Sequence, residues 1–145
     1  MTFLMLSRLR GRFLAAVALA LGLLAVIGCG SKDAYQVSGR AQYKDGSPIT
    51  GGFRVIRLEP GKNSTAKIRK GASGMIAEDG TFELFTRKPG DGVYAGDYVV
   101  TFSVLTKSLG GTSLIPAYYT HPESTPFNIV VDDDKEGLLF ELDKL

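Results

Sequence analysis

Residues 97–105 read DYVVTFSVL and form the most regular strand pattern in the chain. Successive side chains of a β-strand point to opposite faces, so this stretch divides into two sets of alternate residues. One set is uniformly apolar and consists of Tyr98, Val100, Phe102 and Val104. The other set, which is partly apolar, consists of Val99, Thr101, Ser103 and Leu105. Because both faces carry apolar side chains, the stretch predicts a central strand of a sheet.

Outward from this strand, short apolar runs alternate with turn-forming residues over most of the chain. Frequent glycine and other turn residues between β-branched or aromatic runs are typical of an all-β sandwich. We expect about seven short strands and no helix after the first thirty residues. The expected strands cover residues 35–43, 52–58, 75–77, 81–86, 97–105, 127–131 and 138–142.

Two of the expected connections are hairpins. Asp79-Gly80 lies between two apolar runs and predicts a tight turn, because glycine adopts a positive φ at little cost. The last two strands are expected to pair around the acidic turn 132–136. Residues 115–126 contain three prolines and are expected to be irregular, since proline cannot donate a hydrogen bond within a sheet.

The first 28 residues have the features of a secretory signal peptide. Three arginines, Arg8, Arg10 and Arg12, precede the uncharged apolar stretch 13–28, which is 16 residues long. A membrane span needs about 20 apolar residues, and no stop-transfer pattern follows this stretch. The pattern therefore favours a helical signal peptide over the alternative, a permanent transmembrane anchor.

The only cysteine of the chain, Cys29, ends this apolar stretch in the segment LAVIGC at residues 24–29. The segment resembles the bacterial lipobox, which has a large aliphatic residue three positions before a cysteine and a small residue directly before it. The resemblance implies cleavage between Gly28 and Cys29, and a lipid on the Cys29 thiol that anchors the mature chain to a membrane. Two or three acyl chains on one residue make release negligible, whereas a single chain binds reversibly.

These features divide the chain into a signal peptide (1–28), a lipidated tether (29–34) and a β-sandwich domain (35–145). The lipid implies a location on the extracytoplasmic side of the cell envelope. Gly30 follows the cysteine, and in bacteria with two membranes an aspartate at that place is associated with retention at the inner membrane. An outer-membrane destination therefore fits this chain if its organism has such a membrane.

Removal of residues 1–28 changes the charge balance. The full chain has 17 basic and 15 acidic residues, and the signal peptide holds three of the basic ones, so the mature chain has 14 and 15. Without a basic excess, the composition excludes nucleic acid as an expected partner. A single cysteine cannot form a disulfide within the chain, so the mature domain has to be stabilised by packing.

Several short motifs follow one another in a characteristic order. They are VSG at 37–39, YKDGSPI at 43–49, VIRLEP at 55–60, EDGTFELFT at 78–86, PGDGVYAGDYVVTF at 89–102 and IPAYYTHPESTPFNIVV at 115–131. Together they resemble small bacterial lipoproteins that carry a carboxypeptidase-regulatory-like domain. The resemblance covers about residues 37–142 and implies a seven-stranded Greek-key β-sandwich similar to transthyretin. It also implies a non-catalytic accessory or interaction module.

The acidic segment 132–136 is a candidate calcium loop. Asp132, Asp134 and Glu136 occupy the first, third and fifth places of an EF-hand-like loop. An EF-hand needs flanking helices, whereas strands are expected on both sides here. An acidic hairpin turn is therefore the simpler interpretation, and we expect no metal and no cofactor.

The sequence contains no catalytic set. His121 is the only histidine, and it lies in a loop without a neighbouring group suited to general acid–base catalysis. The glycine-rich stretch 89–98 lacks the helix and the lysine of a phosphate-binding loop, so its glycines are interpreted as turn residues. We therefore expect that the protein is not an enzyme.

Two functions of different classes are expected. The first is a structural or protein-interaction module of the cell envelope, bound to an envelope protein that the sequence does not identify. The alternative is a ligand-binding module for glycan or peptide, in which exposed tyrosines provide stacking surfaces: Tyr94, Tyr118 and Tyr119. Basic residues are expected in loops at the membrane end, where solvated charge is a simpler interpretation than lipid contact: Lys62, Lys67, Arg69, Lys70, Arg87 and Lys88.

Overall fold

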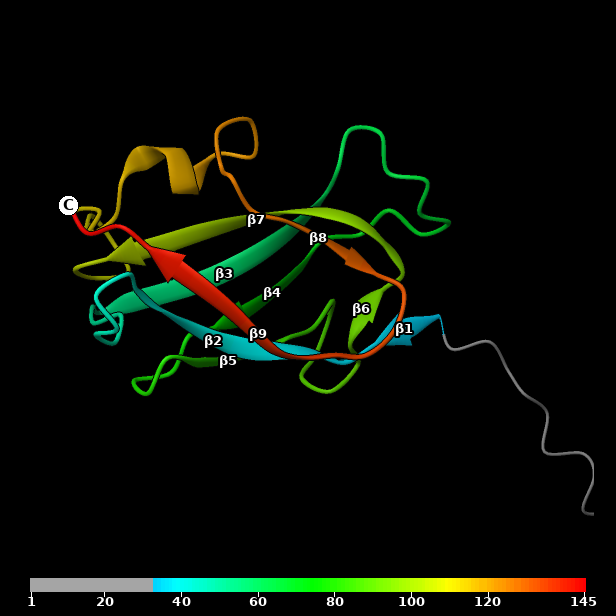
Figure 1. Cartoon of the computed structure of the whole chain (residues 1–145), viewed down its shortest axis with the longest axis horizontal. Helices are drawn as coiled ribbons and strands as arrows, with labels where there is room; N and C mark the ends of the chain where they lie inside the picture. The colour runs from blue at the N-terminus through cyan, green and yellow to red at the C-terminus, as the bar shows by residue number, and fades with distance from the viewer. Residues whose placement is uncertain (1–32) are drawn as a thin grey trace, which may run out of the picture. The chain divides into compact units, whose positions relative to one another are not determined.

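The computed structural model describes residues 33–145 (Figure 1). The predicted signal peptide, its cleavage site and Cys29 lie outside the described residues. Within them the chain forms nine strands and one short 3-10 helix, and the all-β prediction is confirmed. No helix among residues 33–145 is long and apolar enough to cross a membrane.

The strands form two larger sheets and one small ribbon. The four-stranded sheet has the order β4 (Ala72–Met75), β3 (Phe53–Pro60), β7 (Gly96–Leu105) and β8 (Asn128–Val131). The three-stranded sheet has the order β5 (Thr81–Leu84), β2 (Val37–Tyr43) and β9 (Lys135–Leu142). The ribbon consists of β1 (Ala34–Tyr35) and β6 (Val93–Tyr94), and the 3-10 helix η2 spans Ala117–Thr120. The β2–β9 pair is parallel, and the other pairs are antiparallel.

β7 is the central strand that its sequence predicts. It lies between β3 and β8 in the four-stranded sheet. Its apolar set is buried, with no side chain more than 2 % exposed: Tyr98, Val100, Phe102 and Val104. Thr101 on the opposite face is also buried, at 3 % exposure. Both faces of the strand are therefore covered at its middle.

The two larger sheets pack face to face and share one hydrophobic core (Figure 1). Four phenylalanine rings from both sheets and the segment before β8 meet in this core, with centroids 5.2–5.9 Å apart: Phe82, Phe102, Phe127 and Phe140. Residues 33–145 form one compact unit. The architecture is that of a β-sandwich.

The Asp79-Gly80 turn forms as predicted, with Gly80 at a φ of 86°. The strands around it differ from a simple hairpin. β4 begins at Ala72 and pairs with β3, whereas β5 pairs with β2. The turn therefore passes the chain from one sheet to the other, which lets the apolar side chains of both strands face the shared core. A single bridge between Ser73 and Phe85 links the sheets at this side.

The prediction that the last two strands form a hairpin is wrong. β8 pairs with β7 in the four-stranded sheet, whereas β9 begins at Lys135 and runs parallel to β2 in the other sheet. The acidic turn between them carries the chain across the sandwich. The crossing has a physical reason, because it buries Phe140 and Leu142 on the inner face of the three-stranded sheet.

The loops gather at two opposite ends of the sandwich (Figure 1). The Asp33 end holds the first described residue together with three connections: the loops 61–71 and 85–92 and the turn 132–134. The far end holds the C-terminus and three other connections: the turns 44–47 and 77–80 and the loop 106–113. Successive connections along the chain therefore lie at alternate ends of the sandwich (Figure 1).

Candidate functional site

The acidic turn 132–136 is held by bonds within the protein. Lys135 Nζ forms ion pairs with Asp132, at 2.7 Å, and with Asp133. Asp134 Oδ1 accepts a hydrogen bond of 2.7 Å from Gln36 N. Among residues 33–145, no group of three or more His, Cys, Asp or Glu side chains is placed so that it could hold a metal ion. The candidate calcium ligands Asp132, Asp134 and Glu136 therefore belong to a crossing between two sheets rather than to a loop between helices.

The glycine-rich stretch 89–98 is closed by its own carboxylate. Asp91 accepts hydrogen bonds of 2.9–3.1 Å from the backbone N–H groups of Thr86, Arg87 and Lys88. Burial raises the pKa of the Asp91 carboxyl, but these donors outweigh burial and leave the pKa below its usual range. In a phosphate-binding loop such N–H groups would face the ligand. Here Asp91 occupies them, which supports the interpretation as a structural turn.

One carboxylate organises the far end of the sandwich. Asp143 Oδ2 accepts hydrogen bonds from Tyr118 Oη at 2.6 Å, Lys44 Nζ at 2.9 Å and Tyr119 Oη at 2.9 Å. We call these four residues the Asp143 cluster. The bond from Tyr118, followed by those from Lys44 and Tyr119, lowers the pKa of Asp143 to about 2. The cluster joins the C-terminal segment to η2 and to the end of β2.

The three candidate tyrosines do not form a common binding surface. Tyr119 is only 2 % exposed, and its ring stacks on Phe127 with centroids 5.6 Å apart, so the expectation that it is exposed is wrong. The proline-rich segment 115–126, which contains Tyr119, packs over the core. Its sequence has no strand or helix periodicity, so the burial of Tyr119 was not predictable from the sequence. Tyr118 is 39 % exposed, but its hydroxyl is bound to Asp143. Tyr94 is half-buried in the β1–β6 ribbon, at the Asp33 end.

The basic loop residues have different roles. Arg69 closes the loop 61–71, because its guanidinium donates to Ser64 O at 3.0 Å and to Gly61 O at 2.8 Å. Lys62 lies 4.0 Å from Glu123 in an exposed ion pair. The other four side chains are exposed at the Asp33 end: Lys67, Lys70, Arg87 and Lys88.

His121 is exposed at the end of η2. Its backbone carbonyl accepts hydrogen bonds from Ser124 N and Thr125 N, both at 3.1 Å. These bonds use the main chain of His121 and not its imidazole. His121 therefore lies between η2 and the turn that follows it. These contacts do not place a catalytic partner beside its imidazole.

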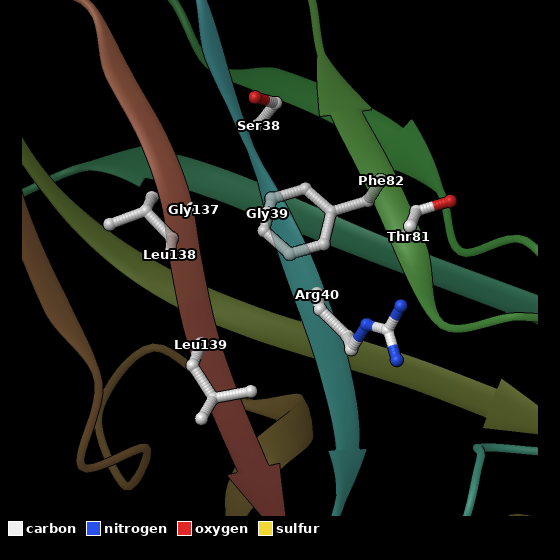
Figure 2. Close-up of a pocket in the computed structure, with 8 residues that line it drawn as sticks. All are labelled: Ser38, Gly39, Arg40, Thr81, Phe82, Gly137, Leu138 and Leu139. Atoms are coloured by element: carbon white, nitrogen blue, oxygen red, sulfur yellow. The ribbon is translucent and has the colours of Figure 1, made fainter.

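A shallow hollow of about 560 Å³ lies over the three-stranded sheet, where β2 and β9 are irregularly paired (Figure 2). Gly39 and Gly137 line it together with Leu139, which is 56 % exposed, and Arg40 carries the only charge among its lining residues. The side chain of Arg40 extends toward β5 in Figure 2. The walls of the hollow are mainly apolar, and the hollow lies on the outside of the sheet and not between elements.

This hollow was not predicted from the sequence, although two glycines within strands are its signal. A Cβ at Gly39 would overlap the carbonyl oxygen of Leu138, so β2 and β9 approach closely there. Gly137 has a φ of 69°, which favours glycine, and no atom lies within 4 Å of the place where its Cβ would be. The missing side chain of Gly137 leaves the surface open at this point.

A scan against protein-family models and searches of curated proteins and solved structures found no match to this chain.

Proposed function

We propose that this chain is a bacterial lipoprotein whose β-sandwich domain is held on the extracytoplasmic side of the cell envelope. The signal peptide 1–28 is removed and Cys29 carries the lipid. The observation that carries the proposal is the spacing: four residues separate Cys29 from β1, so the domain begins directly after the lipobox-like segment. In a bacterium with two membranes, Gly30 after the cysteine fits the outer membrane.

The domain acts in this proposal as a non-catalytic structural or protein-interaction module, with an envelope protein as partner. The use of its carboxylates supports this role. Asp91 binds backbone N–H groups, Asp132 binds Lys135, and Asp143 binds the side chains of its cluster. These groups stabilise turns and chain ends instead of converging on one cleft. The near-zero balance of 14 basic and 15 acidic residues in the mature chain supports a partner other than nucleic acid.

The finer fold assignment belongs to the same proposal. A transthyretin-like, seven-stranded Greek-key sandwich of the carboxypeptidase-regulatory-like kind is supported by the sheets of four and three strands. It is also supported by the four connections in which the chain passes between the two larger sheets: 44–52, 76–80, 85–95 and 132–134.

Mass spectrometry of the protein purified from its own membranes tests the proposal. The expected amino-terminal peptide begins at Cys29 and carries a diacylglyceryl group on the thiol. Incorporation of labelled fatty acid should be lost in the Cys29→Ser variant and retained in the matched control Ser31→Ala. An unmodified Cys29, or residues 1–28 still attached to the natural protein, would refute the lipid anchor.

A further inference from the structure

Two segments that are distant in the sequence meet at Gln36, between β1 and β2. The backbone N–H of Gln36 donates to Asp134 Oδ1 at 2.7 Å, and its carbonyl accepts from Lys135 N at 2.8 Å. Its side-chain amide donates to Gly90 O at 3.2 Å. The acidic turn and the glycine-rich loop therefore bind the same residue.

The chain just before Gln36 is held as well. β1 pairs with β6, and Ala95 N donates to Asp33 O at 3.3 Å. Gly92 lies so close to β1 that a Cβ at this position would be 2.6 Å from Tyr35 O. Residues 33–36 are thus fixed to the domain by two separate segments, 90–95 and 134–135. We call this set of contacts the N-terminal clamp.

We propose that the N-terminal clamp sets the orientation of the domain on the membrane. The inference rests on the lipid anchor proposed at Cys29. Four Cα–Cα steps join Cys29 to Asp33, and these steps span at most about 14 Å. A chain that is fixed from Asp33 onward and anchored this close by holds the Asp33 end beside the bilayer. The far end then faces away from the membrane.

The clamp gives a role to two stretches that resemble ligand-binding motifs in the sequence. The acidic turn supplies Asp134 and Lys135 to Gln36, and the glycine-rich loop supplies Gly90 and the close approach at Gly92. Both stretches lie at the Asp33 end (Figure 1). Their unusual compositions are explained by the need to enclose the first strand of the domain.

The orientation can be measured on the lipidated mature chain, residues 29–145, in vesicles of phosphatidylcholine and phosphatidylglycerol. The lipid blocks Cys29, so a thiol introduced by Thr65→Cys at the Asp33 end, or by Ser108→Cys at the far end, takes a fluorescent donor alone. Energy transfer to acceptor-labelled lipid should be several-fold higher from residue 65. The ten-residue β7 alone spans about 33 Å, so the two ends are distinguishable.

The clamp itself is tested by hydrogen exchange in the same chain. The Gln36 amide should exchange much more slowly than the amide of Ser108 in the exposed loop. Asp134→Ala should speed this exchange by about tenfold, as expected when a charge-assisted hydrogen bond is lost, and it should reduce the difference in energy transfer between the two ends. Glu136→Ala removes a carboxylate from the same acidic segment without touching Gln36 or the ion pairs of Lys135, and it should change neither measurement.

The outcomes separate the two proposals. A Gln36 amide that exchanges as fast as that of Ser108 overturns the clamp. Equal energy transfer from residues 65 and 108 in the lipidated protein overturns the fixed orientation. A chain without lipid on Cys29 refutes the anchor, and with it the orientation on the membrane, while the exchange of the Gln36 amide still decides whether the clamp exists.

Discussion

Each end of the sandwich is organised by one residue that reaches several segments, and the two residues use different chemistry. At the Asp33 end, Gln36 makes two of its three bonds with its own backbone. At the far end, Asp143 makes three bonds with a single carboxylate oxygen. The bonds of Gln36 depend mainly on the position of its backbone, whereas those of Asp143 depend on one side chain and its charge.

This difference indicates which changes should break the contacts at each end. The N-terminal clamp should resist the loss of the Gln36 side chain but should be sensitive to anything that pushes its strands apart. The Asp143 cluster should tolerate small movements but should fail when one oxygen is removed or protonated. Four predictions test this contrast.

The largest effect is expected at Gly92. Gly92→Ala places a Cβ 2.6 Å from Tyr35 O and keeps a φ of 73° that suits glycine. Backbone strain and overlap together should lower the free energy of unfolding by about 3 kcal/mol. Gly46→Ala is the control at the far end, because it has a φ of 81° and no neighbour within 4 Å. It should cost about 1–2 kcal/mol. Urea unfolding measures both, and equal losses would contradict the close approach at the clamp.

Asp143→Asn should give a smaller loss at neutral pH, since it weakens three hydrogen bonds at once. The pKa of Asp143 is lowered to about 2 in the folded protein, below the usual value of about 3.9 for an unfolded chain. Its stabilisation is therefore complete above about pH 4 and is lost as the pH falls to about 2. Thermal unfolding over this range should show the midpoints of wild type and variant converging in acid. A difference between the two unfolding midpoints that stays constant with pH would mean that the charge of Asp143 does not contribute to stability.

Tyr119→Phe should lower the free energy of unfolding by about 1 kcal/mol, because it removes one hydroxyl from the cluster and keeps the buried ring. Tyr43→Phe is the matched control, since its hydroxyl is not one of the donors to Asp143. The free energies of unfolding of the two variants, measured with a chemical denaturant, should differ by this amount. Identical curves would assign the stability of this end to ring packing alone.

The smallest effect is expected for Gln36→Ala. This variant loses the exposed side-chain bond to Gly90 O but keeps both backbone bonds of the clamp. The free energy of unfolding should change by less than about 0.5 kcal/mol. A loss as large as that of Tyr119→Phe would show that the clamp depends on the glutamine side chain after all.

Local patterns predicted the parts of the fold that local physics controls. The alternation in 97–105 identified β7, and Asp79-Gly80 identified its turn. The glycines of 89–98 were interpreted as turn residues, and Gly92 has the positive φ that such a role implies. In each case the deciding interactions lie within a few residues of one another.

Contacts between distant residues were not predictable in the same way. β8 and β9 are separated by a short turn, which suggests a hairpin, yet β9 pairs with β2 about 100 residues earlier. This pairing buries Phe140 against the phenylalanine rings of the core, and those rings come from distant parts of the sequence. Tyr118 and Tyr119 are neighbours in an irregular segment, and only the folded chain decides which ring is buried. Gln36 is an ordinary polar residue in sequence, and its importance comes from segments 54 and 98 residues away.

The position of β2 also determines how the domain bears mechanical force. β2 leaves the Asp33 end along the length of the sandwich, between β5 and the parallel strand β9 (Figure 1). A pull on the chain ahead of Asp33 therefore acts along the strand, while its hydrogen bonds run across that direction. All of these bonds are sheared together instead of opening one after another, so the domain should resist stretching better than a hairpin that is peeled from its end.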